Sequence, residues 1–155
     1  MSGFWSSLKF FATAPVFAIA NPTLVSADTN LVEIGKLAYV AWSCAATGSI
    51  AQEEKTETER LFIIGYENAS TFLLASSNGE VTEEVFSKVP IGLSLNLSHG
   101  PTPGFQLGVL WARIESHVYD RHWPKDLGAS FDEKQEIQIQ SARNAFHNGN
   151  CELIK

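Results

Sequence analysis

The chemically richest stretch of the sequence is ARIESHVYDRHW, which holds two histidines, two arginines, a glutamate, an aspartate, a tyrosine and a tryptophan. Residues four positions apart lie on one face of a helix, so Arg113, His117 and Arg121 form a row. This row points away from the apolar residues of the same segment, and its charge suits an anion. One interpretation is therefore a candidate binding strip of Arg113, His117 and Arg121, flanked by Tyr119 and Trp123.

The same residues also fit a solvated polar face near a helix end, where the dipole favours His and Arg. A zinc site is not expected, because His117 and His122 are five positions apart and diverge by about 140° on a helix. Phosphate loops, nucleophile elbows, His-Glu-x-x-His and a Cys beside a His base do not occur. The sequence thus predicts no cofactor and no metal and assigns no catalytic residue, although a carboxylate pair that includes Glu67 stays open.

Length and charge limit the fold and the partners. A chain of 155 residues, of which 45% are hydrophobic, has the size of one ordinary domain with its own core. The net charge is -6, with 11 basic residues scattered among 17 acidic ones. A nucleic-acid surface would need clustered Lys and Arg, and an anionic membrane repels an acidic protein, so we expect neither as a partner.

The N-terminus has the pattern of a signal peptide. An apolar run follows Lys9 and is too short for a comfortable membrane span, and small residues at alternate positions allow cleavage after Ala20 or after Ala27. We expect cleavage after Ala27. Residues 1–27 would then be a cleaved signal peptide and 28–155 a single helical domain without a membrane span, located outside the cytoplasm, in a periplasm or secreted. A buried N-terminal helix or a retained anchor is the alternative.

The two cysteines, Cys44 and Cys151, fit an oxidising location. They form no Cys-x-x-Cys motif that would suggest zinc or haem. A bond between them would stabilise the fold by about 4–5 kcal/mol in the chain-entropy model. The alternative is a pair of buried thiols that act as small apolar residues.

Helical periodicity predicts an all-α fold, a compact bundle of about five to six helices. Predicted helix starts lie at Asn30 with Glu33 as a capping box, at Glu53 to Glu59, at Thr82, at Thr102 with Pro103, and at Ser130 with Glu133. Predicted stops lie at Thr47 to Ser49, at Asn78-Gly79 and at Asn148 to Asn150. Residues 91–98 alternate in polarity as a half-buried strand does, but no second strand is predicted that could pair with them. We expect a short helix there, with a strand as the alternative.

Two packing expectations follow from the helical patterns. The segment from Leu61 to Ser76 is apolar on more than one stripe, so its helix should lie near the centre of the bundle, with Gly65 allowing a neighbour to approach closely. The helix after Pro103 should be packed on two sides, one of them tight because it carries only small residues. These small residues are Gly104, Gly108 and Ala112.

Two functions fit these observations. The first is a small exported all-helical protein that binds another protein, as an inhibitor, an immunity-type partner or an envelope accessory factor. Exposed aromatic side chains such as Tyr119 and Trp123 are common anchors in protein interfaces. The second is a small secreted helical enzyme that binds an anionic substrate through the Arg/His strip. The arginines available to it are Arg60, Arg113, Arg121 and Arg143. The lack of a catalytic motif favours binding.

Overall fold

The longest helix, α1 (Ala27–Ala51), is the central element of the fold, because every other α-helix packs against it. The computed structural model describes residues 27–94, 100–125 and 128–155. The buried side of α1 is built mainly from alanines, with Trp42 as its one large fully buried side chain. Small side chains let neighbouring helices approach the α1 backbone closely, which explains how one helix can contact all the others.

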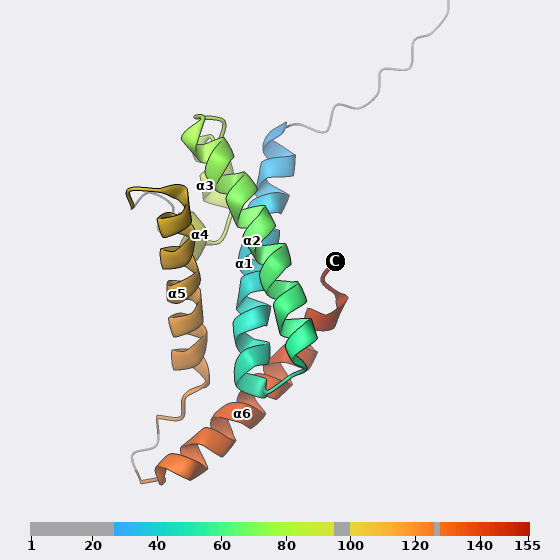
Figure 1. Ribbon diagram of the computed structural model, residues 1–155, viewed down its shortest axis with the longest axis vertical. Helices are drawn as coiled ribbons and strands as arrows, with labels where there is room; N and C mark the ends of the chain where they lie inside the picture. The colour runs from blue at the N-terminus through green and yellow to red at the C-terminus, as the bar shows by residue number, and fades with distance from the viewer. Residues whose placement is uncertain (1–26, 95–99, 126–127) are drawn as a thin grey trace, which may run out of the picture.

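Five further α-helices and a short 3-10 helix surround α1: α2 (Lys55–Ser77), α3 (Glu83–Lys88), α4 (Ile91–Ser94), α5 (Pro103–His122), α6 (Phe131–Asn148) and η1 (Cys151–Leu153). The described residues contain no strand, which confirms the all-α bundle of five to six helices. Helix α2 runs back along α1, α5 runs in the direction of α1, and α6 crosses the end of the bundle where α1 ends (Figure 1).

The helix starts that position α5 and α6 are those that the sequence predicts. The Thr102 hydroxyl accepts a hydrogen bond from the Phe105 amide at 3.3 Å, and Pro103 occupies the first helical position. The Ser130 hydroxyl accepts one from the Glu133 amide, while the Glu133 carboxylate accepts one from the Ser130 amide at 2.8 Å. After α6, Asn150 adopts a left-handed φ of 53°, as the stop signal predicts.

The predicted ends of the first helix are wrong at both sides. Helix α1 already begins at Ala27, so Asn30 lies inside its first turn and does not cap it. The helix also continues through Thr47 and Gly48, because the Thr47 hydroxyl donates to the Ser43 carbonyl at 2.7 Å and Gly48 is buried beneath the Phe146 ring. Tertiary packing thus outweighs the weak helix propensity of this stretch.

The prediction of two packed sides for α5 is half correct. Leu107, Leu110, Ile114 and Val118 are buried in the core. The small residues Gly104, Gly108 and Ala112 are exposed instead, and a Cβ atom at either glycine would meet nothing within 4 Å. Helix α2 is likewise not central, since its Ile63 is 53% exposed. The close approach at Gly65 is confirmed, with the Trp42 indole as the neighbour.

A disulfide joins the core of α1 to the chain that follows α6. The Sγ atoms of Cys44 and Cys151 are 1.96 Å apart, and the bond spans a sequence separation of 107 residues. It lies in an apolar cluster with Ala45, Leu61 and Phe146. The expected pairing of the two cysteines is therefore confirmed.

Several predictions fall wholly or partly on residues that the structure does not describe. The expected signal peptide lies outside the described residues except for Ala27, the first residue of α1. The expected helix at 91–98 is present as α4 up to Ser94, and the rest of that segment lies outside the described part. Within residues 27–94, 100–125 and 128–155, no helix combines the length and the apolar character that a membrane span requires.

Candidate functional site

The structure places the predicted cationic row on the exposed surface of α5. Arg113, His117 and Arg121 are all exposed, and Arg121 Nη2 lies 3.0 Å from His117 Nε2. Arg113 and His117 also line a hollow of about 280 Å³ together with Tyr39 of α1 and Ile91 of α4. The row therefore has a concave surface beside it.

The two predicted aromatic flanks lie elsewhere on α5. The rings of Tyr119 and Trp123 stack with their centroids 5.6 Å apart. Trp123 also contacts the Phe131 ring, with a centroid distance of 5.8 Å. Tyr119 follows His117 by two residues and so points about 200° away from it around the helix. It lines a different hollow, together with Ala112 and Glu115. The structure thus divides the five predicted residues between two sides of α5.

The other histidine and arginines that the sequence singles out make contacts that hold the fold together. His122 is only 7% exposed, and its Nδ1 lies 2.9 Å from the Ser141 hydroxyl of α6. Burial, with a smaller contribution from the charge of Arg121, lowers the pKa of His122, so the ring is neutral near pH 7. Arg143 donates to the carbonyl of Ala51 at 3.2 Å, at the end of α1.

Arg60 is similarly engaged at the start of α2. Its Nε donates to Glu57 Oε2 at 2.8 Å, and its Nη1 donates to the carbonyl of Ile154 in the C-terminal segment. The hydrogen bond from Arg60 lowers the pKa of the Glu57 carboxyl. Arg60 therefore holds the start of α2 to the C-terminal segment, and Arg143 holds α6 to the end of α1.

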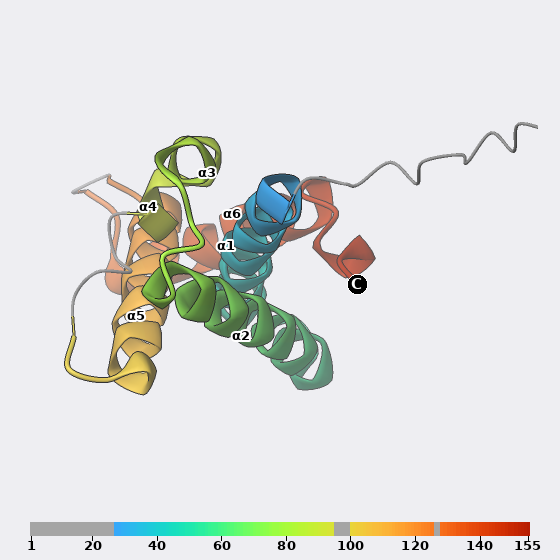
Figure 2. The ribbon, with the colours of Figure 1, turned by 90° about the horizontal axis from the view of Figure 1, so that it is seen from above.

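The structure adds a surface that the sequence analysis did not find, centred on a contact between α2 and α5. The rings of Phe62 and Trp111 meet edge to face, with their centroids 4.9 Å apart. Both rings rest on the buried Trp42, at 6.1 and 5.9 Å respectively. From this contact α2 runs obliquely away from α5 toward its own N-terminal end, as the view along the bundle shows (Figure 2).

Two hollows that share Ser49 of α1 lie beside this contact. One, of about 290 Å³, lies between α2 and α5 over α1, and the other, of about 340 Å³, lies between α1 and α5. We call the two together the α2–α5 groove. Its lining residues are Ala45, Ala46, Ser49 and Ile50 of α1, Thr58, Glu59, Phe62 and Ile63 of α2, and Trp111, Ala112, Glu115, Ser116 and Tyr119 of α5.

The walls of the α2–α5 groove carry large apolar side chains that no part of the described chain covers. Ile63 is 53% exposed and Tyr119 is 44% exposed, and Tyr66 stacks beside Phe62 at the rim. The two charged side chains in the lining, Glu59 and Glu115, are carboxylates on opposite walls. Concave, apolar and aromatic surfaces of this kind are where proteins bind partners.

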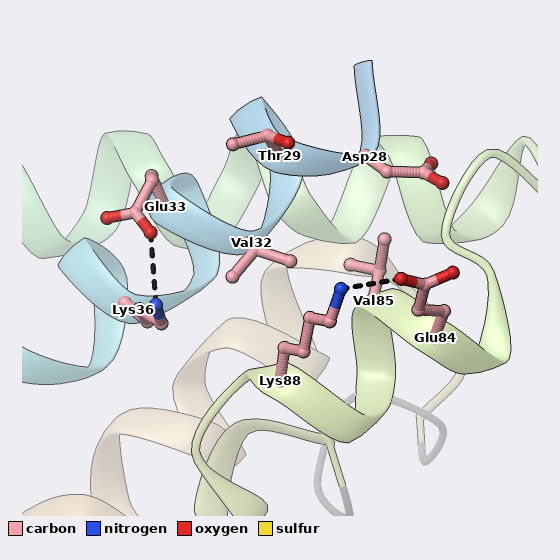
Figure 3. A pocket seen from close by; sticks show the side chains of 8 residues that line it. All are labelled: Asp28, Thr29, Val32, Glu33, Lys36, Glu84, Val85 and Lys88. Atoms are coloured by element: carbon pink, nitrogen blue, oxygen red, sulfur yellow. Dashed lines mark hydrogen bonds and ion pairs between the residues drawn. The ribbon is translucent and has the colours of Figure 1, made fainter. Parts of the chain in front are cut away.

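A further hollow lies at the other end of the molecule, between the start of α1 and α3 (Figure 3). Its volume is about 440 Å³. Lys36 forms an ion pair with Glu33 at 3.0 Å, and Lys88 pairs with Glu84, each partner coming from the same helix. Each lysine in the lining already has a carboxylate partner, and the remaining charged side chain is Asp28, so the lining does not favour an anionic ligand.

Neither a grouping of metal ligands nor similarity to a known protein indicates the function. In the part of the chain that the structure describes, no three His, Cys, Asp or Glu side chains are grouped to hold a metal ion. Comparison of the chain with protein-family models, with curated proteins and with solved structures finds no match. The functional argument therefore depends on the geometry of the α2–α5 groove and of the cationic row.

Proposed function

We propose that this protein acts outside the cytosol by binding another protein, and that the α2–α5 groove is its binding surface. The observation that carries this proposal is the set of large apolar side chains left uncovered around one groove, with Ile63 53% exposed at its edge. Contact between apolar side chains and water is unfavourable, so a partner that covers these side chains lowers the free energy by burying them.

A hydrogen bond ties one wall of the groove to its floor. The Trp42 indole nitrogen donates a hydrogen bond to the Phe62 carbonyl at 3.1 Å, which fixes the wall of α2 on the floor of α1. Aromatic residues lose little conformational entropy on binding and dominate the energetics of many interfaces. Phe62, Trp111 and Tyr119 are therefore the expected anchors.

The location outside the cytosol is supported by two independent features. The N-terminal pattern is that of a cleaved leader. Disulfides such as Cys44–Cys151 form and persist mainly in oxidising compartments. An inhibitor, an immunity-type partner or an envelope accessory factor would each fit this location. Mass spectrometry of the exported protein should find Asp28 as its first residue, and an exported chain that starts at Met1 would contradict the leader.

Site-specific crosslinking tests the binding surface. A photo-crosslinking amino acid at Ile63 should capture a partner in the intact extracytoplasmic fraction of the producing cells. The matched control is Ile91, which is 73% exposed and lies on the other side of α5, beside the cationic row. Capture from Ile63 and not from Ile91 supports the proposal. Capture from Ile91 alone, or equal capture from both positions, would place the binding surface elsewhere.

A second function is favoured by the hollow beside Arg113 and His117. The Arg113 guanidinium and the His117 imidazole, next to a Tyr39-lined recess, could hold a small anionic substrate of a secreted enzyme. Titration with inorganic phosphate tests this function directly. Binding that is abolished by Arg113→Glu with Arg121→Glu would support it. The absence of phosphate binding in the unmodified protein would leave protein binding as the function.

A further inference from the structure

We propose that the segment which the α2–α5 groove receives is a cationic amphipathic helix of the partner. Its apolar side would lie on Phe62, Ile63 and Trp111, and its Lys or Arg side chains would reach Glu59 and Glu115. This inference rests on the proposed function and adds the chemistry of the partner to it.

The sign of the charge follows from the lining of the groove. Of the side chains that line the two hollows, the charged ones are Glu59 on the α2 wall and Glu115 on the α5 wall, and no Lys, Arg or His is among them. No described residue forms an ion pair with Glu115. Glu59 forms an ion pair with Lys55, whose side chain is 87% exposed, and the Lys55 Nζ to Glu59 Oε1 distance is 3.4 Å. A cationic partner would satisfy both carboxylates at once.

The arrangement of charge on α5 strengthens this argument. Arg113, His117 and Arg121 lie on the side of α5 that faces away from the groove, while Glu115 lies on the groove side. The positive charges of α5 are thus separated from its binding wall by the width of the helix. The charged lining of the groove is acidic, which favours a basic partner both in the encounter and in the bound state.

The backbone chemistry of the groove favours a helical partner. A peptide that binds by adding a strand needs a strand edge to pair its amides and carbonyls, and the described residues contain no strand. A helix pairs these groups internally and presents only side chains, so it can lie in an apolar groove without unpaired backbone groups. The floor of Ala45, Ala46 and Ser49 and the exposed Gly108 and Ala112 leave room for a close helix approach.

Two designed peptides test the proposal on the full chain. One is a Leu/Lys amphipathic helix of about 18 residues, about 27 Å long. The other has the same leucines and glutamate in place of every lysine. Trp111 lies in the groove, so its fluorescence and isothermal titration can both follow binding. We expect the Leu/Lys peptide to bind and the Leu/Glu peptide to bind at least about tenfold more weakly.

A charge-reversal variant separates specific binding from general attraction to an acidic protein. Glu59→Lys with Glu115→Lys should reverse the preference, so that the Leu/Glu peptide binds better. The matched control, Glu67→Lys with Glu136→Lys, changes the net charge equally at two exposed carboxylates that do not line the groove. It should keep the preference for Leu/Lys. If both variants change the preference equally, or neither does, the proposal is wrong.

Three further results tell apart a failure of this inference and a failure of the proposed function. If the partner captured from Ile63 binds the charge-reversal variant as tightly as the unmodified protein, the groove binds a protein but not a cationic helix. If the chain itself sediments as a dimer that the charge reversal dissociates, the occupant is a second copy of this chain, which also overturns the inference. If the native partner crosslinks only outside the groove, the proposed function fails whatever the peptides do.

Discussion

The indole of Trp42 lies directly against Gly65, so that a Cβ atom at Gly65 would be only 2.7 Å from the indole Cγ. The same indole supports Phe62 and Trp111 and donates a hydrogen bond to the Phe62 carbonyl. The absence of a side chain at Gly65 therefore determines where the α2 wall of the groove stands.

Gly65→Ala should destabilise the protein by about 1–3 kcal/mol, because the added methyl group overlaps a ring that is itself fully buried. Gly108→Ala is the matched control. Gly108 is also inside a helix but faces open space, so alanine there should leave stability unchanged or raise it by up to about 1 kcal/mol. Urea unfolding of both variants measures the difference, and equal destabilisation would contradict the packing described for Trp42.

Reduction of the disulfide should lower the free energy of unfolding by up to about 4–5 kcal/mol, because Cys44 and Cys151 close a long loop. Urea unfolding with and without a reductant measures the loss. The variant Cys44→Ala with Cys151→Ala is the control, and its stability should not respond to the reductant. Unmodified protein that is equally stable in both conditions would contradict the stabilising role of the bond.

Acid should weaken the junction of α5 and α6 through His122. Its pKa is lowered in the folded state by burial and by Arg121, so on acidification the unfolded chain takes up the proton first, near pH 6.5. Stability is therefore lost as the pH falls below this value. His122→Gln should lose less stability than the unmodified protein between pH 7 and pH 5 in urea unfolding.

The exposed His117 provides the control for this measurement. His117→Gln leaves the contact between His122 and Ser141 in place, so this variant should retain the full acid-induced loss. The opposite pattern, in which the His117 variant and not the His122 variant resists acid, would assign the pH response to the cationic row.

The parts of the fold that could be predicted from the sequence are those that depend on neighbouring residues. The caps at Thr102 and Ser130 are local hydrogen bonds, so the residue types alone indicate them. Helix α1 continues through Gly48 because Phe146, which is remote in the sequence, packs onto it. A local pattern cannot contain that information, and for this reason a break was expected there.

The groove could not be predicted for a related reason. Phe62 and Ile63 look like core residues in a sequence, and whether they are covered depends on how far α2 diverges from α5. The row of Arg113, His117 and Arg121 is exposed as helical spacing predicts. Tyr119 lies on the groove side and not beside that row, because two residues on a helix separate its side chain from that of His117 by about 200°.

The affinity of Ile63→Asp for the partner captured by crosslinking tests the central claim most directly. Ile91→Asp serves as its control, and circular dichroism must show that both variants keep the helical fold. We predict that Ile63→Asp binds at least about tenfold more weakly than the unmodified protein, because a charge is placed in the apolar wall, while Ile91→Asp binds as before. Unchanged affinity of Ile63→Asp, or an equal loss in both variants, would contradict binding at the α2–α5 groove.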